Sequence, residues 1–381
     1  MKVASLLYQN NTFIKEINKD ELQYENVQLL LGFGSGKLIT DPKVYSDIQS
    51  KFPNATLCLC STAGEIFDVE VFDHSISLLA LNFSTSYIKT AVVNIESTSS
   101  SLEAGQKLID QLPKENLKLI FVLSDGGLVN GSELVKGLNS KNTAGVLITG
   151  GMAGDGTDFN KTYVGLNNIP ESGNIVAIGF YGEKLTLAHG SLGGWESFGL
   201  EREVTKAIGN ELFEIDNKNA LDLYKTYLGK YANELPGSAL LFPLAIKLSD
   251  KQDAIVRTIL SIDENKQSMT FAGDIPEGSK VVRFMKANFD RLIDAASDAA
   301  TNCIGMMLME PKLALLISCV GRKIILSNRI EEEVEVVAEI FGSKTSLAGF
   351  YSYGEISPLK PFSNCELHNQ TMTITCLDEL D

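Results

Sequence analysis

The sequence predicts an α/β fold, with two α/β sandwich domains whose mixed sheets are built from a repeated strand-helix-strand unit. Two observations carry this prediction. Apolar runs typical of buried strands alternate with helical patterns, and a turn with a glycine followed by an acid comes after several of these runs. The turn occurs as Gly64-Glu65, Gly154-Asp155, Gly273-Asp274 and Gly354-Glu355. Because a recurring block indicates an internal repeat, we expect Gly64, Gly154 and Gly354 at equivalent strand ends.

The three units are predicted in chain order from their periodicity and caps. The first has a strand at residues 27–31, a glycine-rich stretch at 32–37, and a helix at 42–49 that Asp41 caps, with Pro42 at its first position. Its remaining strands are expected at 56–60 and 75–81. The second unit repeats this order with strands at 117–123, 144–149, 163–166 and 175–181 and a helix at 132–138. The third has strands at 313–319, 348–355 and 371–375 and a helix at 330–341.

A different stretch separates the second unit from the third. Alternating runs around Gly209-Asn210 predict a hairpin over residues 203–215. Asn219 is the expected cap of a helix that runs to Leu228 and ends at Gly229. The glycine-rich residues 190–199 are the candidate boundary, which divides the chain into domains at residues 1–200 and 201–381.

Composition narrows the class of protein. A chain of 381 residues with 44% hydrophobic residues is long enough for two cores. The excess of 48 acidic over 33 basic residues gives a net charge of −15, which opposes binding to nucleic acid or to an anionic membrane. No apolar window is long enough for a membrane span, and six cysteines are too few for a disulfide framework. We therefore expect a cytoplasmic protein in which Cys58 and Cys60 are buried apolar side chains.

Polar side chains gather on turns after apolar strands in the last part of the chain, where we expect one small-molecule pocket. Arg257 and Arg322 each require an acid or a ligand carboxylate as partner if they are buried. The residues expected to line the pocket are Arg257, Arg322, Tyr351, Ser352, Tyr353, Glu355, His368 and Asn369.

An enzymatic alternative uses the same residues. Ser352 lies one glycine short of a nucleophile elbow, and Glu355 and His368 follow it, so a serine hydrolase is conceivable. Pro358 and Pro361 oppose the helix that should follow the nucleophile. The incomplete elbow favours a non-enzymatic binding protein.

Several motifs together resemble the FIST family. They are residues 150–156, 204–207, 241–246, 349–356 and 368–371, and they occur in the family's order. The resemblance covers almost the whole chain, with an N-terminal FIST domain to about residue 200 and a C-terminal FIST domain beyond it. It implies a sensory module for small ligands such as amino acids.

Stand-alone chains of this length are similar to the family's haem-binding nitric-oxide sensors, which act on a separate histidine kinase or cyclic-di-GMP enzyme. Haem needs an axial ligand, most often a histidine, and the chain has three histidines. His368 is the first candidate for this metal ligand, because its polar neighbours could orient the ring, and His189 is the second. His74 is expected in an exposed loop.

Overall fold

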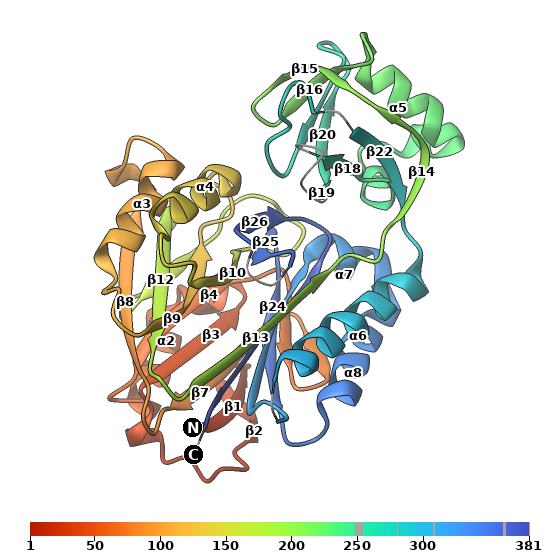
Figure 1. Ribbon diagram of the computed structural model, residues 1–381. Coiled ribbons are helices and arrows are strands. Elements are labelled where there is room, and N and C mark those ends of the chain that lie inside the picture. The colour runs from red at the N-terminus through yellow and green to blue at the C-terminus, as the bar shows by residue number, and fades with distance from the viewer. Residues whose placement is uncertain (248–253, 280, 308, 361–362, 381) are drawn as a thin grey trace.

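The protein consists of a large body and a smaller lobe (Figure 1). A computed structural model describes residues 1–247, 254–279, 281–307, 309–360 and 363–380. The body contains three six-stranded sheets, and the lobe contains two smaller sheets formed by strands between Glu196 and Lys286. This arrangement of mixed sheets and helices confirms the predicted α/β class.

Each sheet of the body is built around two parallel strands joined by a segment that contains a helix. The parallel pairs, with the helix between them, are β3 (Leu29–Gly34) and β4 (Thr56–Ser61) with α2 (Pro42–Lys51), β9 (Leu117–Ser124) and β10 (Leu147–Met152) with α4 (Gly131–Lys141), and β23 (Leu313–Cys319) and β24 (Ser346–Ser352) with α8 (Ile330–Phe341). The three units predicted from the sequence are therefore present. The predicted cap of α2 is confirmed, because the Asp41 side chain accepts a hydrogen bond from the Lys43 N–H.

Antiparallel strands complete each sheet on the other side of its first parallel strand. They are β7 (Ile76–Asn82), β1 (Lys2–Gln9) and β2 (Thr12–Ile17) in the first sheet, β12 (Asn174–Tyr181) and β8 (Tyr87–Asn94) in the second, and β27 (Met372–Glu379) and β13 (Leu185–Leu192) in the third.

The three units also exchange strands, which closes them into a ring. Beside β4 of the first unit lies β11 (Val164–Leu166) of the second; beside β10 of the second lie β25 (Gly354–Pro358) and β26 (Cys365–His368) of the third; and beside β24 of the third lie β5 (Glu65–Phe67) and β6 (Glu70–Phe72) of the first. Each unit therefore supplies an edge to another unit's sheet, which protects the otherwise unpaired strand edge.

The repeated glycine turns lie where these exchanges begin. Gly64, Gly154 and Gly354 each follow the second strand of a parallel pair, which confirms their predicted equivalence. Backbone N–H groups of these turns donate to the preceding strand ends around the ring: Ala63 to Tyr351 O (2.8 Å), Gly154 to Ser61 O (2.9 Å) and Tyr353 to Met152 O (3.2 Å). Gly273 is different, because it follows an antiparallel strand of the lobe.

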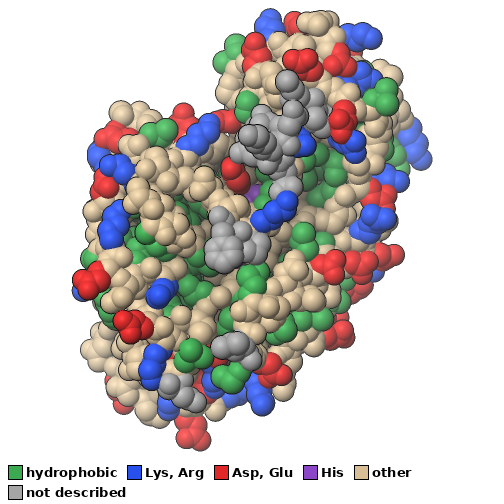
Figure 2. Space-filling model, in the orientation of Figure 1, with side chains coloured by type: hydrophobic (Ala, Val, Ile, Leu, Met, Phe, Trp, Pro, Cys, Tyr) green, Lys and Arg blue, Asp and Glu red, His purple; other side chains and the backbone are tan. Residues whose placement is uncertain are grey.

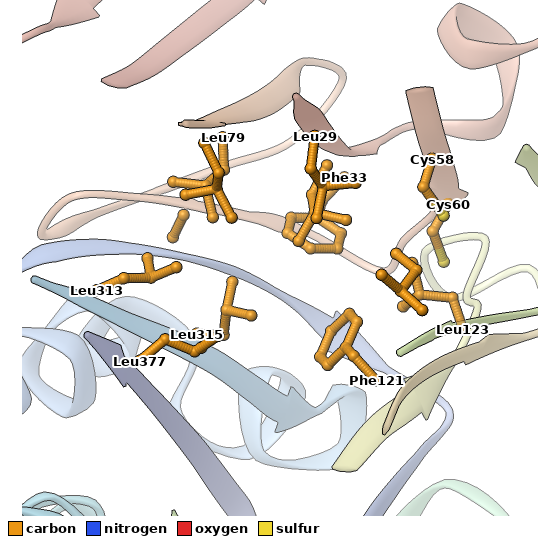
Figure 3. Close-up of a cluster of buried hydrophobic side chains, with 14 of the residues drawn as sticks. Leu29, Phe33, Cys58, Cys60, Leu79, Phe121, Leu123, Leu313, Leu315 and Leu377 are labelled. Atoms are coloured by element: carbon orange, nitrogen blue, oxygen red, sulfur yellow. The ribbon is translucent and has the colours of Figure 1, made fainter. Parts of the chain in front are cut away.

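The inner faces of the three sheets pack against one another in a shared core (Figure 3). Alternate residues of every unit contribute to it, including Phe33, Phe121 and Phe350. Cys58 and Cys60 are both 0% exposed within this core, which confirms that they are buried apolar side chains. Helices cover the outer faces, among them α3 (Ser101–Gln111) and α6 (Phe289–Met306).

The lobe has its own core and is inserted between β13 and α6. One sheet contains β14 (Glu196–Arg202), β22 (Val281–Lys286), β18 (Leu244–Lys247) and β19 (Ile255–Arg257); the other contains β15 (Val204–Ile208), β16 (Glu211–Ile215), β21 (Ser268–Phe271) and β20 (Ile259–Asp263), with β17 (Lys218–Asn219) beside β16. The predicted hairpin is β15 and β16, with Gly209 at φ 60° in its turn. The predicted helix is α5 (Ala220–Leu228), which Asn219 caps.

The sheets divide the chain differently from the expected domains at 1–200 and 201–381. Residue 200 lies inside β14, and the strands after Leu313 share sheets with strands before residue 193. The physical reason is the strand exchange, which needs the last unit to complete the body. None of the helices in the described part of the chain is both long and apolar enough to span a membrane.

Candidate functional site

A cavity of about 240 Å³ lies between the body and the lobe, where Figure 2 shows the surface hollowed between the two. The body side is formed at the carboxyl ends of β9, β10, β23 and β24, the usual location of ligand sites in α/β sheets. The lining residues are Gly126, Gly127, Phe159, Asn160, Thr162, Cys319, Val320, Gly321, Tyr353 and Asn369 from the body and Leu240, Thr258, Leu260 and Ala272 from the lobe.

Buried polar atoms without a partner mark this cavity. The hydroxyl of Thr258 and both amide atoms of Asn369 have no hydrogen-bond partner among the described residues, although Thr258 is 5% and Asn369 1% exposed. Gln370, beside Asn369, also leaves both amide atoms unpaired, and its amide lies against Gly321 of the lining. Such orphans are rare because desolvation without a partner is costly. Of these residues, Thr258 and Asn369 line the cavity, which makes it the candidate site for a ligand that would bond them.

Hydrogen bonds hold the loops that line the body side in place. The Asp125 carboxylate accepts from the N–H groups of Gly127 (2.8 Å) and Leu128 (2.6 Å), and the Gly126 N–H donates to the Thr162 hydroxyl (2.8 Å). Because these loops are fixed before any ligand arrives, the entropic cost of binding is reduced.

Tyr353 and Phe159 form an aromatic wall of the cavity. Their rings stack with centroids 4.7 Å apart. The Tyr353 hydroxyl donates to the Asp155 carboxylate and accepts from the N–H groups of Asp155 and Phe159, both at 3.2 Å. Burial and the hydrogen bond to Asp155 raise the pKa of Tyr353, so its hydroxyl stays neutral. The glycine-acid turn of the second unit therefore orients an aromatic side chain of the third.

Only Tyr353 and Asn369 of the eight residues expected in one pocket line this cavity. The structure differs from the expectation for the other six. Their side chains are buried and take protein partners, as the following contacts show.

Arg322 and Tyr351 belong to a buried ion network around Glu333. Arg322 and Glu333 are both 0% exposed, and the guanidinium donates from Nε (3.0 Å) and Nη2 (2.8 Å) to Glu333 Oε2. Its remaining bonds go to the carbonyls of Gly193 (2.8 Å) and Leu292 (2.6 Å). Tyr351 donates to Glu333 Oε1 at 2.9 Å. Arg322 is therefore paired with an acid of the chain itself and joins α7 (Val320–Leu326) to α6 and the lobe's connection.

Ser352 and Glu355 form a second buried set. The Ser352 hydroxyl donates to Glu355 Oε1 (2.7 Å), and Thr371 donates to Oε2 from its N–H (3.1 Å) and hydroxyl (2.9 Å). Burial raises the pKa of Glu355 to about 7, against the lowering effect of these hydrogen bonds.

The first unit contains a copy of this set around Glu65. Thr62 donates to Glu65 Oε1 (2.6 Å), and Ser75 donates to Oε2 from its N–H (3.2 Å) and hydroxyl (2.8 Å). Burial raises the pKa of Glu65 to about 7 as well. Because the arrangement recurs at an equivalent turn away from the cavity, it serves the turn itself. The hydrolase set is not assembled, since the Ser352 hydroxyl bonds Glu355 and His368 bonds another partner.

His368 and Arg257 bond backbone carbonyls. His368 is 1% exposed, its Nε2 lies 2.8 Å from Ser357 O, and burial lowers its pKa to about 4. Arg257 donates to Leu367 O in the body (2.8 Å) and to Asp274 O (3.3 Å), so it ties the lobe to the body. Asp274 in turn accepts from Lys136 (3.0 Å) and Asn130 (3.1 Å) of the body. The fourth glycine-acid turn, Gly273-Asp274, therefore joins the lobe to the body.

The cavity does not fit haem. Its volume of about 240 Å³ is not far above the roughly 150 Å³ that accommodates benzene, whereas the macrocycle is several times larger. No histidine lines it, and burial raises the pKa of its Cys319 thiol, which opposes the thiolate form that binds iron. His189 is 6% exposed within β13. His74 is exposed at a turn with φ 57°, as predicted.

Sequence reasoning missed Thr258, Phe159, Gln370 and the backbone at Gly321. Thr258 adjoins Arg257 and Gln370 adjoins Asn369, so the predicted segments were near the site. Tertiary packing decides which residue of each adjacent pair lies at the cavity, and the local sequence pattern does not predict this.

Comparisons with known proteins cover most of the chain. A family model described as the FIST N domain matches residues 28–218, and one described as the FIST C domain matches residues 220–358. The junction between them lies near the boundary expected from the sequence. An uncharacterized protein of Methanocaldococcus jannaschii is 25% identical over an alignment of 358 residues. The match covers 82% of this chain and 66% of that relative's length.

Two solved structures show weak likeness. A cyanuric acid hydrolase from A. caulinodans has 8% identity and a TM-score of 0.34 over 95% of this chain and 92% of its own. PurLQS from Thermotoga maritima has 8% identity and a TM-score of 0.21 over 84% of this chain and 75% of its own. These scores are too low to establish a shared fold.

Proposed function

Because this chain belongs to the FIST family, whose domains are sensory and bind small ligands, we propose that it is a non-enzymatic sensor whose ligand occupies the cavity between body and lobe. One observation carries the proposal. Two residues that line the cavity, Thr258 of the lobe and Asn369 of the body, carry buried polar atoms that have no partner among the described residues. A ligand that bonds both would link the two parts.

The size of the cavity favours a ligand of amino-acid size over haem with nitric oxide. If benzene occupies roughly 150 Å³, a volume of about 240 Å³ suits a molecule of roughly ten non-hydrogen atoms. The stacked rings of Phe159 and Tyr353 supply the apolar contact that most small-molecule sites use.

Ligand binding would be signalled by a change in the position of the lobe relative to the body. The lobe is connected to the body by the segments before β14 and after β22, and its contacts with the body include the Asp274 cluster. A ligand that contacts both sides stabilises the closed arrangement by its differential affinity for it. We propose that a separate partner, such as a histidine kinase or a cyclic-di-GMP enzyme, responds to this change.

The test is retention of a natural ligand. The purified protein is mixed with the small-molecule fraction of a cell extract and washed, and the compounds released on denaturation are identified by mass spectrometry. Gly127 lines the cavity, and a Cβ there meets only the Asp125 carboxylate, at 3.7 Å, so Gly127→Leu extends into the cavity. Gly305 is exposed, with nothing within 4 Å of a Cβ, so Gly305→Leu is the matched control.

The proposal predicts that the wild type and Gly305→Leu retain the same compound and that Gly127→Leu loses it. Equal retention by all three proteins would place the ligand elsewhere.

A further inference from the structure

We infer that the ligand is an uncharged molecule with a hydrogen-bond acceptor next to a donor, as in a carboxamide or a lactam, and that Asn369 binds this edge. The inference rests on the proposed function and narrows the class of ligand. It is based on two observations. Asn369 and Thr258 have polar atoms without a partner among the described residues, and the described residues that line the cavity have no charged side chain.

Asn369 offers a complementary edge. Its Oδ1 accepts and its Nδ2 donates. Neither atom has a partner in the part of the chain that the structure describes, and the residue is 1% exposed. An amide edge pairs with another such edge through two parallel hydrogen bonds, as Asn does with adenine. A carbonyl alone, which can only accept, would leave Oδ1 without a donor. The Thr258 hydroxyl supplies one further bond from the lobe.

Among the described residues, none of those that line the cavity has a charged side chain. The two nearby arginines that a carboxylate would need are engaged, Arg257 with the carbonyls of Leu367 and Asp274 and Arg322 with Glu333 and two carbonyls. A ligand carboxylate or ammonium group would be desolvated here without a counter-charge, which is far more costly than burying a neutral amide. The cavity therefore selects against charge and against a zwitterion.

Phe159 and Tyr353 favour a flat ligand. Their rings are nearly parallel, at 19°, and Phe159 remains 51% exposed. A planar conjugated amide can lie against this wall while its polar edge meets Asn369, whereas a branched aliphatic molecule makes poorer contact with a ring face.

The experiment is isothermal titration calorimetry with three probes of similar size. Benzamide is the uncharged planar amide, benzoate is its charged counterpart, and leucine is the zwitterion. Each is titrated into the wild type, Asn369→Leu and Asn233→Leu, in which an exposed asparagine of the lobe is changed in the same way. Circular dichroism checks that each variant is folded.

We expect the wild type to bind benzamide about tenfold or more tightly than benzoate or leucine. Asn369→Leu should lower the affinity for benzamide by about tenfold or more, and Asn233→Leu should leave that affinity unchanged. Unchanged binding by Asn369→Leu, or no binding of benzamide at all, overturns the inference. If leucine or benzoate binds instead and Gly127→Leu abolishes that binding, the class of ligand is wrong but the proposed function stands. The proposed function is refuted by a different result, which is that Gly127→Leu retains the same compound from the cell extract as the wild type.

Discussion

Replacing Arg322 with methionine tests whether this residue supports the fold or clamps a ligand. Methionine replaces the apolar stem of arginine but has no guanidinium group, so Glu333 remains buried, with only Ser318 and Tyr351 donating to it. The carbonyls of Gly193 and Leu292 also lose their donor. The structure therefore predicts a large loss of stability.

The magnitude follows from the number of groups left without a partner. Breaking a buried ion pair by removing one member costs about 3–5 kcal/mol, and each orphaned carbonyl adds about 1 kcal/mol or more. Because the hydroxyls of Ser318 and Tyr351 still solvate Glu333, we expect Arg322→Met to lower the free energy of unfolding by about 4 kcal/mol. Adding Glu333→Leu should restore much of this loss, since the charge without a partner is then gone.

The assay is urea unfolding followed by far-ultraviolet circular dichroism, with Arg291→Met as the matched control. Arg291 forms a salt bridge with Glu196 at 2.8 Å, but its side chain is 62% exposed. Such a surface pair is worth about 0–1 kcal/mol. If Arg322→Met were no less stable than Arg291→Met and instead lost ligand binding, the structural role of Arg322 would be refuted.

Four other substitutions probe the repeats and the site. Burial raises the pKa of Glu355 to about 7 from its ordinary 4.5, so the folded state keeps a proton that the unfolded state releases, and stability is lost as the pH rises between these values. Glu355→Gln removes this dependence, and its stability relative to wild type should rise by up to about 1.4 kcal/mol per pH unit in urea titrations over that range. Glu65→Gln should give the same slope, and flat differences would refute the raised pKa. Gly150→Ala should cost about 2 kcal/mol or more in thermal unfolding, because φ is 149° and its Cβ would lie 1.9 Å from the Val122 carbonyl oxygen; a neutral change would contradict this packing. Asn369→Leu should raise the stability of the unliganded protein by about 1 kcal/mol, since two orphaned atoms disappear, and a clear loss of stability would mean that Asn369 has a partner within the protein.

The elements could be predicted from the sequence because their signals are local. The cap at Asp41, the hairpin turn at Gly209 and the helix cap at Asn219 each depend on a few neighbouring residues. The repeated glycine turns were also visible, since one turn chemistry recurs after each parallel pair.

The strand exchange could not be predicted in this way. Phe350 pairs with Glu65 across most of the chain, and an apolar strand does not specify its partner by its own periodicity. The partner of Arg322 could not be predicted for the same reason. A buried arginine needs an acid, but only the packing of α7 against α8 identifies that acid as Glu333. Asn369 was predicted because it is a polar neighbour of His368 soon after the Glu355 turn, whereas its lack of a partner among the described residues is visible only in three dimensions.

The fluorescence of Trp195 tests most directly whether a ligand occupies the cavity between body and lobe. Trp195 is the single tryptophan of the chain and lies where the lobe begins. Its Nε1 donates to Gln370 O at 2.9 Å, next to Asn369. We predict that titration with benzamide produces a saturable change in its emission, with the dissociation constant measured by calorimetry, and that Gly127→Leu abolishes the change. Calorimetric binding of benzamide that leaves the emission of Trp195 unaltered, or an emission change that persists in Gly127→Leu, would contradict the site.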